Sequence, residues 1–480
     1  ADNKLVEVEV GCPRCKNFRP LIVSTNVAPK NLETASTNGA LFIRVLDASG
    51  QPVPDATVSV NNGQGQLVPV VVDDTTNAEG MLQIVDAPPG INTYSISVTK
   101  SGYTTDSTYK IGNVENPNPL KPYATVAIQQ VTQISFIIDK FSNLDISTIR
   151  DTCSVVPNVS FSVKGTRLIG VDPDTFKYSK NFTSNASGQK LISDIEWDSY
   201  NISLNDATYD VVGTNPLLPI SLLPDTSQDF DIVVAPKVPR GLLVVVRDAA
   251  SGLPVASSTV TIASGGFGNS RITGRGFINQ TDWSGGSGQD NFTDATRYFT
   301  ASSTVDINVP AGEIKLHDSF GIYEENGALV SSTFDTGSPS NFHQLSWKPT
   351  DQPVSAGSDS VRMQIATNND NATWNFIGPD GTTDSYYTSA TSDINGVHNG
   401  SQYLRYKIFL NTEDTSVTPN ISDISFTFTS SCVPPGQAFF GGLSAGTYDV
   451  SVLHDDYSSI NIQTDVSANW QKLDISITPQ

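Results

Sequence analysis

Charged residues, sulfur and long apolar runs are scarce in this chain of 480 residues. Only 16% of the residues are charged, and there are two methionines, four cysteines and four histidines. The longest purely aliphatic run is Leu242–Val246, far short of the roughly 18 apolar residues that a membrane span needs. The sequence therefore predicts no membrane-spanning helix within this stretch.

Basic residues are outnumbered by acidic ones, 28 against 49, which gives a formal net charge of −21. The acidic residues are scattered singly through Ser/Thr/Asn/Gly-rich sequence rather than gathered in blocks. A chain of this charge repels phosphate backbones and anionic lipid surfaces. We therefore expect no nucleic-acid partner, and we expect a soluble, exposed protein.

Recognisable catalytic motifs are also missing. The four histidines, His317, His343, His398 and His454, form no HExxH motif, and no Gly-Lys-Ser/Thr phosphate loop is present. The Gly-Gly-Ser-Gly sequence at 285–288 lacks the strand-to-helix context of a nucleophile elbow. We therefore predict that the chain is not an enzyme and needs no cofactor.

Thr, Ser, Val, Ile, Asn, Gly and Pro dominate the sequence, which is typical of short strands joined by turns. A two-part repeat runs through it. The opening half occurs at Gly39–Val60 ("GALFIRVLDASGQPVPDATVSV") and at Gly241–Ile262 ("GLLVVVRDAASGLPVASSTVTI"). The closing half occurs at Asn77–Tyr94 and at Gly436–Tyr448 ("GQAFFGGLSAGTY"). Each pair of halves predicts one small β-sandwich.

The two copies differ in the distance between their halves. From Gly50 to Gly80 is 30 positions, whereas from the equivalent Gly252 to Gly436 is 184, a surplus of 184 − 30 = 154. A surplus of this size is a whole domain. Because loop-closure entropy grows only with the logarithm of loop length, such an insertion in a sandwich loop is tolerated.

A looser third copy lies between these two. The run "QISFIID" is interpreted as its opening strand, and the excursion Ser142–Val156 replaces the tight turn. Its closing half runs from Gly188 to Tyr200, 12 positions, the same as from Gly436 to Tyr448. The equal spacing predicts the same closing structure in both copies.

The predicted fold is therefore all-β, with tandem immunoglobulin-like β-sandwiches, the third interrupted by a jelly-roll-like sandwich. The predicted domains are a β-hairpin at 1–38, sandwiches at 39–131 and 132–238, a split sandwich at 239–280 plus 431–480, and the insert at 281–430.

The cysteines are Cys12, Cys15, Cys153 and Cys432. Cys12 and Cys15 form the motif "CPRC". Three interpretations are open: a redox pair, half of a zinc site that the two distant cysteines complete, and a local disulfide or unreactive thiols, which is preferred. Cys153 and Cys432 each lie in a loop of a sandwich. A bridge between adjacent sandwiches is a further candidate in a secreted protein.

The insert carries the best candidate binding site. Flat aromatic rings and short acidic groups gather in "NNDNATWNFIGPDGTTDSYY", as they do in sugar-binding sandwiches. Oxygen-rich loops of this kind also hold calcium, for which Asp370 and Asp380 are the candidates. The alternative is that the rings fill the core and the aspartates make turns. The candidate ligand-binding residues are Trp374, Phe376, Asp380, Asp384, Tyr386 and Tyr387.

The "D..SG.PV..A.V.V" opening and the "G…L..G.Y" closing resemble the carboxypeptidase regulatory-like, or transthyretin-like, module in all three copies. The order of "VEVEV", "PLIVSTNVAPKNLET", "KSGYTTDSTY" and "IEWDSYNI", with an interrupted third module, is similar to large pilin-like (type IV pilin or pseudopilin-type) surface proteins of candidate-phylum bacteria. The resemblance implies that residues 1–38 end a truncated pilin-like head, whose missing apolar helix would be the only contact with a membrane.

The resemblance also implies an extracellular, cell-surface location and other pilus or filament subunits as partners. Together with the aromatic segment, it predicts a structural and adhesive protein, the ectodomain of a minor-pilin-like appendage component that binds a surface glycan. Two alternatives stay open: a ligand-free spacer or filament subunit, and the non-catalytic part of a surface hydrolase.

Overall fold

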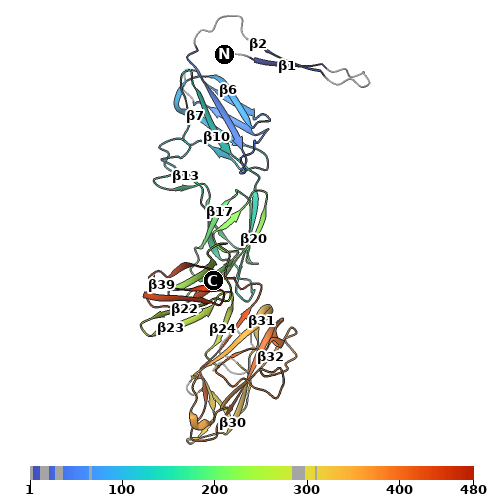
Figure 1. Cartoon of the computed structure of the whole chain (residues 1–480), viewed down its shortest axis with the longest axis vertical. Coiled ribbons are helices and arrows are strands. Elements are labelled where there is room, and N and C mark those ends of the chain that lie inside the picture. Colours follow the sequence, from blue (N-terminus) through green and yellow to red (C-terminus); the bar gives the residue numbers. More distant parts are fainter. Residues whose placement is uncertain (1–3, 11–20, 28–35, 64–67, 284–297, 309–310) are drawn as a thin grey trace, which may run out of the picture.

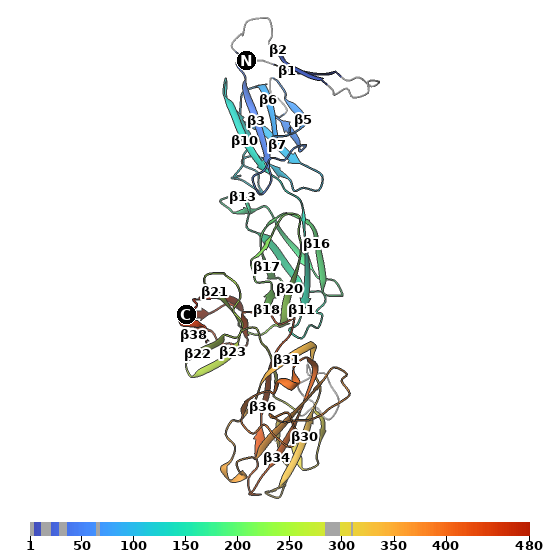
Figure 2. The same cartoon turned by 45° about the vertical axis from the view of Figure 1, so that its right-hand side comes forward.

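The computed structural model describes residues 4–10, 21–27, 36–63, 68–283, 298–308 and 311–480. These residues form strands and turns, with two one-turn 3-10 helices, η1 (Val354–Ala356) and η2 (Gly396–His398). The fold is all-β, as the composition predicts. No described helix is long and apolar enough to cross a membrane. The molecule is elongated, with a hairpin at one end and a large sandwich at the other (Figures 1 and 2).

The N-terminal hairpin consists of β1 (Lys4–Val10) and β2 (Leu21–Val27), which pair antiparallel in a two-stranded sheet of their own. The alternation of apolar and polar residues in "LVEVEV" predicts these strands. Cys12 and Cys15 fall between them, outside the described residues.

The first sandwich, module 1, is organised around β3 (Gly39–Leu46). This strand pairs antiparallel with β6 (Met81–Ala87) and parallel with β10 (Val131–Ile137). Its alternate residues Leu41, Ile43 and Val45 are fully buried, because every second side chain of a strand points to the same face. The second sheet contains β5 (Val71–Thr75), β4 (Thr57–Asn61), β7 (Gly90–Thr99), β8 (Asp106–Ser107) and β9 (Ala124–Val126).

The second sandwich, module 2, repeats this topology. Its central strand β11 (Ser142–Ile149) pairs antiparallel with β16 (Gln189–Ile195) and parallel with β20 (Ser227–Pro236), which also pairs with β18 (Tyr209–Asn215). The facing sheet has the order β15 (Ser179–Thr183), β12 (Ser160–Gly165), β17 (Asp198–Leu204) and β19 (Ile220–Leu222), and a small sheet joins β13 (Leu168–Gly170) to β14 (Thr175–Phe176).

The expected start of module 2 needs correction. Residues 132–137, expected to open it, are the last strand of module 1, where Phe136 and Ile138 are buried in the core. Ser142–Ile149, expected to be an excursion, is the central strand β11. The error arose because the last strand of each module lies parallel and next to the first, so its sequence has the same apolar alternation as an opening strand.

The third sandwich, module 3, is built from both ends of an interrupted stretch. Its central strand β21 (Gly241–Asp248) pairs antiparallel with β37 (Gln437–Phe440) and parallel with β40 (Trp470–Ile477). The facing sheet has the order β23 (Phe267–Ile272), β22 (Thr259–Ser264), β38 (Gly446–His454) and β39 (Tyr457–Val466). In all three modules the central strand of the first sheet therefore has the same two neighbours, and module 2 adds β18 beyond β20.

The insert leaves and rejoins module 3 through one pair of strands. β24 (Gly276–Gln280) enters it and β36 (Asp423–Thr429) leaves it, and the two pair antiparallel. The chain therefore enters and exits at adjacent points, as a tolerated insertion requires. It also follows that residues 276–280, expected to belong to module 3, are part of the insert.

The 15-residue strand β31 (Phe334–Lys348) joins the two halves of the main sheet of the insert, through a register shift between Asp335 and Ser340. Trp283, Tyr406 and Phe426 pack in its core. The main sheet also contains β34 (Ser401–Asn411), β30 (Asn326–Ser331), β25 (Tyr298–Ala301), β32 (Val361–Asn368) and β33 (Thr391–Asp393), and smaller sheets contain β26 (Val305–Asn308), β27 (Ala311–Leu316), β35 (Asn420–Ile421), β28 (Asp318–Ser319) and β29 (Ile322–Tyr323).

Modules 2 and 3 share part of one core. Leu243 and Val245 of β21 are buried in the cluster that fills module 2, and Trp470 packs against it. The Trp470 indole N–H donates to the Val211 carbonyl at 2.7 Å, and the Gln437 side chain bonds both backbone groups of Thr214. A shared core and saturated polar contacts make this junction rigid.

Candidate binding site

The segment 369–390, which contains the predicted binding residues, follows β32 in the insert. Two isolated bridges, Ile365 to Ile377 and Met363 to Tyr387, return the segment along β32. Because β32 also pairs with β34 from Val361 to Asn368, the segment brings its rings over the outward side chains of β34.

Arg405 of β34 lies between two aromatic rings. Its guanidinium carbon is 4.1 Å from the centre of the Phe299 ring and 4.4 Å from that of Trp374. The side chain is 2% exposed, its Nε donates to Thr333 Oγ1 at 3.0 Å, and its Nη2 has no hydrogen-bond partner among the described residues. Burial lowers the pKa of Arg405 to about 10. The site thus holds a desolvated cation stabilised by ring faces.

Further cations pack on aromatic rings along β34 and β32. Lys407 Nζ lies 4.7 Å from the centre of the Phe409 ring, and the Arg362 guanidinium lies 4.8 Å from that of Tyr386. The Tyr386 and Phe409 rings meet edge to face at 5.3 Å. We call these residues the cation–aromatic ladder: Phe299, Arg405, Trp374, Lys407, Phe409, Tyr386 and Arg362.

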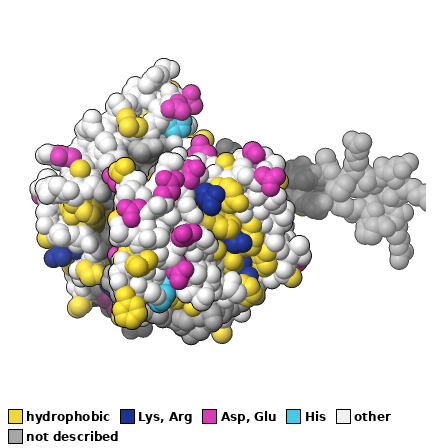
Figure 3. Space-filling model, turned by 90° about the horizontal axis from the view of Figure 1, so that it is seen from below, with side chains coloured by type: hydrophobic (Ala, Val, Ile, Leu, Met, Phe, Trp, Pro, Cys, Tyr) yellow, Lys and Arg dark blue, Asp and Glu magenta, His cyan; other side chains and the backbone are white. Residues whose placement is uncertain are grey.

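The end of the molecule that the insert forms is shown in Figure 3, where basic and hydrophobic side chains alternate along one strip of the surface. Trp374 and Tyr386 are half-buried. Each ring therefore keeps part of its surface open to solvent while the rest packs on a cation. Such fixed, flat and partly exposed rings are what a sugar face requires.

Two further predicted aromatics are placed differently. Phe376 is half-buried, next to the bridge at Ile377. Tyr387 is only 1% exposed, belongs to the core cluster of the insert, and accepts a hydrogen bond from the Asn395 N–H at 3.1 Å. Burial raises the pKa of its phenol. Tyr387 is therefore a core residue, which corrects its assignment to a ligand surface.

The three aspartates of the segment are exposed. Asp370 accepts hydrogen bonds from the N–H groups of Ala372 and Thr373 and from the Thr373 hydroxyl. These bonds lower the pKa of Asp370, and the Ser385 hydroxyl and Thr382 do the same for Asp380. Asp384 donates its N–H to the Thr382 hydroxyl at 3.4 Å. The carboxylates of Asp370 and Asp380 thus stabilise turns.

Within the described residues, no group of three or more His, Cys, Asp and Glu side chains converges to hold a metal ion. Calcium at Asp370 and Asp380 stays a prediction.

Two histidines of the insert, His343 and His398, each lie beside a threonine. His343 Nε2 and Thr429 Oγ1 are 3.0 Å apart, and His398 Nδ1 and Thr367 Oγ1 are also 3.0 Å apart. His398 is 2% exposed, and burial lowers its pKa to about 4. Both rings serve as hydrogen-bonding groups within the insert.

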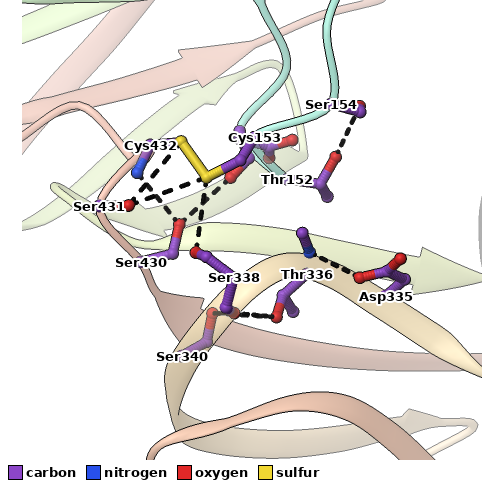
Figure 4. Close-up of a disulfide and its surroundings, with 12 residues drawn as sticks. Thr152, Cys153, Ser154, Asp335, Thr336, Ser338, Ser340, Ser430, Ser431 and Cys432 are labelled. Atoms are coloured by element: carbon purple, nitrogen blue, oxygen red, sulfur yellow. Dashed lines mark hydrogen bonds between the residues drawn. A yellow bond between two sulfur atoms is a disulfide. The ribbon is translucent and has the colours of Figure 1, made fainter. Parts of the chain in front are cut away.

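Cys153 and Cys432 form a disulfide between module 2 and the end of the insert, across 279 residues of sequence (Figure 4). The surrounding loop is held by the Ser430 hydroxyl, which donates to the Asp151 carbonyl at 3.3 Å. Gly337, at the bend of β31, approaches the Thr152 carbonyl so closely that a Cβ there would lie 1.5 Å from the oxygen. The insert is thus fastened to module 2 as well as to module 3.

Sequence reasoning found Trp374 and Tyr386 but missed the residues that hold them, Arg362, Arg405 and Phe299. The signal for Arg405 was present in the strand 403–410, whose two faces both carry bulky groups. A strand with cations and rings on its outward face indicates that another segment covers that face. Phe299 carries no local signal, because it comes from a distant strand.

The fold defines a class: a chain of repeated β-sandwiches with one sandwich inserted into the last. Within it, residues 40–137 match the family model of the carboxypeptidase regulatory-like domain. That range ends at the last residue of β10, in agreement with the corrected extent of module 1. No curated protein matches the chain.

Solved structures similar to the chain include the Bacillus anthracis TIE protein, at 10% identity and a TM-score of 0.18, covering 99% of this chain and 58% of that one. Another is GBS52, the minor pilin of Streptococcus agalactiae, at 15% identity and a TM-score of 0.19, covering 42% of this chain and 99% of that one. A streptococcal ancillary pilin has 8% identity and a TM-score of 0.18, covering 92% and 99%.

The chain thus spans just over half of the TIE protein. TM-scores this low do not support any function for this chain.

Proposed function

We propose that this protein is an extracellular stalk that presents the insert as a binding head, and that the cation–aromatic ladder binds a surface glycan. The observation that carries the proposal is the sandwich of Arg405 between Phe299 and Trp374, on the insert at the far end from the N-terminal hairpin. Arg405 has no carboxylate partner among the residues that the structure describes. A stable core does not require such a buried cation, and perturbed groups of this kind gather at functional sites.

Carbohydrate suits the chemistry of the ladder better than other ligands. Half-buried rings such as Trp374 and Tyr386 stack on the apolar face of a sugar, and the partly exposed cations Arg362 and Lys407 attract its oxygens. The exposed carboxylates of Asp380 and Asp384 lie in the same segment and can accept hydrogen bonds from sugar hydroxyl groups. Neither of them is paired with a basic side chain among the described residues.

A glycan array with the purified chain tests this proposal. We expect a signal for a subset of glycans that Trp374→Ala abolishes, because the substitution removes one ring of the sandwich. Phe320→Ala is the matched control, since Phe320 is a fully exposed ring elsewhere on the insert. Equal signals for the wild type and Trp374→Ala, or no signal for any glycan, would rule out the ladder as a sugar site and favour a ligand-free spacer.

We further propose that the chain acts among other subunits of a surface filament, as a minor-pilin-like component. The support is the sequence resemblance and the elongated, repeated architecture. Immunogold labelling of intact cells with an antibody to the insert tests this. Label along or at the tip of filaments is expected, and label confined to the medium would contradict it.

A further inference from the structure

A cleft lies where module 2, module 3 and the insert meet, away from the cation–aromatic ladder. Its volume is about 560 Å³, within the range of about 300–1,000 Å³ that small-molecule sites occupy. Module 2 contributes residues 150 and 151 and the strand β20, module 3 contributes the end of β23 and residues 433–439, and the insert contributes β24, β31 and β36.

Positive charge dominates the rim of this cleft. Arg150, Arg271 and Arg275 line it together with one carboxylate, Asp151, which lies close enough to Arg271 to act on its charge. In a chain of net charge −21, three arginines around one hollow are a local reversal of sign. Asp393 lies close enough to Arg275 to act on its charge, and burial lowers the pKa of both Arg271 and Arg275. Cations held out of water in a concave site attract an anion.

Small polar groups of β31 and β36 line the side of the cleft that the insert forms, and we call these residues its floor. Gln344 and Ser346 of β31 lie opposite Thr427 and Ser425 of β36, and the two serine hydroxyls are 2.7 Å apart. Thr427 Oγ1 is buried and has no partner among the described residues. A buried hydroxyl without a partner is costly, and a ligand hydroxyl would satisfy it.

The remaining wall is apolar, with Val433, Pro434 and Phe439 facing the cleft. The floor strand β36 is already paired along both of its edges, with β24 on one side and β31 on the other. Their backbone groups are therefore not available to an added peptide strand. A body rich in hydroxyl groups, with an apolar face and an acidic substituent, fits all three surfaces.

The Cys153–Cys432 disulfide lies beside the cleft and connects two of its walls. Asp151 precedes Cys153 by two residues, and Val433 follows Cys432 directly. The bridge therefore holds module 2 and the end of the insert in place before any ligand arrives. Such preorganisation strengthens binding by reducing the entropy lost on association.

We propose that this cleft binds an acidic oligosaccharide, with Arg150 and Arg275 contacting the carboxylate or sulfate and the floor hydroxyls contacting the sugar. This site is separate from the ladder, so the two proposals stand or fall independently.

Isothermal titration of the full chain with a digalacturonate disaccharide, its neutral methyl ester and a sulfated disaccharide tests the proposal. We expect acidic disaccharides to bind at least about tenfold more tightly than the ester, because a hydrogen bond to a charged group contributes about 1.5–3 kcal/mol. Arg275→Gln and Arg150→Gln should each weaken acidic binding about tenfold. The Cys153→Ser/Cys432→Ser pair should weaken it as well.

The controls are Arg44→Gln, which changes an exposed arginine of module 1, and Phe320→Ala, which removes an exposed ring of the insert outside both the cleft and the ladder. Both should keep the affinity of the wild type, and thermal melting should show that each variant is folded. Any one of three outcomes would overturn the proposal. These are equal affinities for the acid and the ester, unchanged binding in the folded Arg275→Gln and Arg150→Gln variants, and no binding of either acidic disaccharide at about 10 mM. At that concentration only contacts weaker than about 3 kcal/mol would be missed.

Discussion

A glycine and a tyrosine define the closing half of each module. Gly80, Gly188 and Gly436 have φ values of 69°, 67° and 66°, in the left-handed region that side chains other than glycine rarely adopt. The carbonyl of each accepts a hydrogen bond from the first sheet, as Gly436 does from the Val246 N–H at 2.8 Å. The repeated glycine therefore fixes the turn that brings the closing half onto the central strand.

The tyrosine of the motif is buried in every module. The hydroxyls of Tyr94, Tyr200 and Tyr448 donate to backbone carbonyls four to six residues upstream, at 2.6, 2.5 and 3.2 Å. Burial raises the pKa of Tyr94 and of Tyr200. The ring fills the core while the hydroxyl satisfies a carbonyl of the preceding turn. The glycine-to-tyrosine spacing is 12 positions in modules 2 and 3, where the hydroxyl reaches four residues upstream, and 14 in module 1, where it reaches six.

Gly436→Ala should destabilise module 3 by about 3 kcal/mol, because it combines a left-handed φ with a clash. A Cβ at this position would lie 2.6 Å from the Pro254 Cβ and 2.9 Å from the Val246 carbonyl oxygen. Gly442→Ala is the matched control, since φ there is 71° and nothing lies within 4 Å of the added Cβ. It should cost about 1 kcal/mol. Equal losses in urea unfolding would contradict the role of the close approach.

His398 should make the insert sensitive to acid. Its pKa is about 4 when folded and about 6.5 when unfolded, so the unfolded chain binds more protons between these values. Stability is then fully present above pH 6.5 and falls as the pH drops towards 4, by about 3 kcal/mol at most. His343, whose pKa is also lowered by burial, acts in the same direction.

The measurement is the melting temperature of the wild type and of His398→Gln between pH 7 and pH 4. The variant should lose most of the pH dependence, whereas His317→Gln, at a more exposed histidine of the same insert, should keep it. A wild-type melting temperature that stays constant across this range would contradict the buried, neutral state of His398.

At the scale of elements, the repeat motif made the all-β fold predictable, but not the order of strands. The alternation of "QISFIID" indicates a strand without showing whether it ends module 1 or starts module 2. Only the parallel pairing of β10 with β3 decides this, and such pairing joins residues about 90 positions apart, as Val131 pairs with Ala40. Local patterns do not encode such long-range pairs.

The candidate site was likewise only partly predictable from the sequence. Aromatic residues close together in sequence, such as Trp374 and Tyr386, could be found because the segment that carries them is short. Their cationic partners lie on strands that reach them only through the sheet, so Arg405 and Arg362 gave no signal beyond bulky alternation. The sequence also could not separate Tyr387 from Tyr386, because adjacent residues point to opposite faces and which face is buried depends on the fold.

Trp470 should couple modules 2 and 3 as one folding unit. Its ring packs on the core of module 2 and its N–H bonds Val211, although it belongs to β40 of module 3. Trp470→Ala should cost about 3–5 kcal/mol and split one calorimetric transition into two. Trp470→Phe, which keeps most of the packing but loses the hydrogen bond, should cost less and leave one transition. A single unchanged transition in Trp470→Ala would show that the junction does not couple the modules.

At the scale of the whole molecule, module 1, module 2 and the insert lie roughly in line, while module 3 lies to one side (Figure 2). The insert is connected in sequence to module 3, yet the disulfide joins it to module 2. The disulfide therefore connects module 2 of the stalk directly to the insert, in addition to the connection through module 3. A head held by two strands and a disulfide keeps a fixed direction, which a single flexible linker could not provide.

Pulling a single molecule from its two ends tests this arrangement most directly. The disulfide encloses 279 − 1 = 278 of the 480 residues, so 480 − 278 = 202 can extend while it is intact. Fully extended chain spans 3.3–3.6 Å per residue, so the oxidised protein should lengthen to about 70 nm, and reduction should add about 95 nm. The same final length with and without reductant would contradict a stalk and head joined through Cys153 and Cys432.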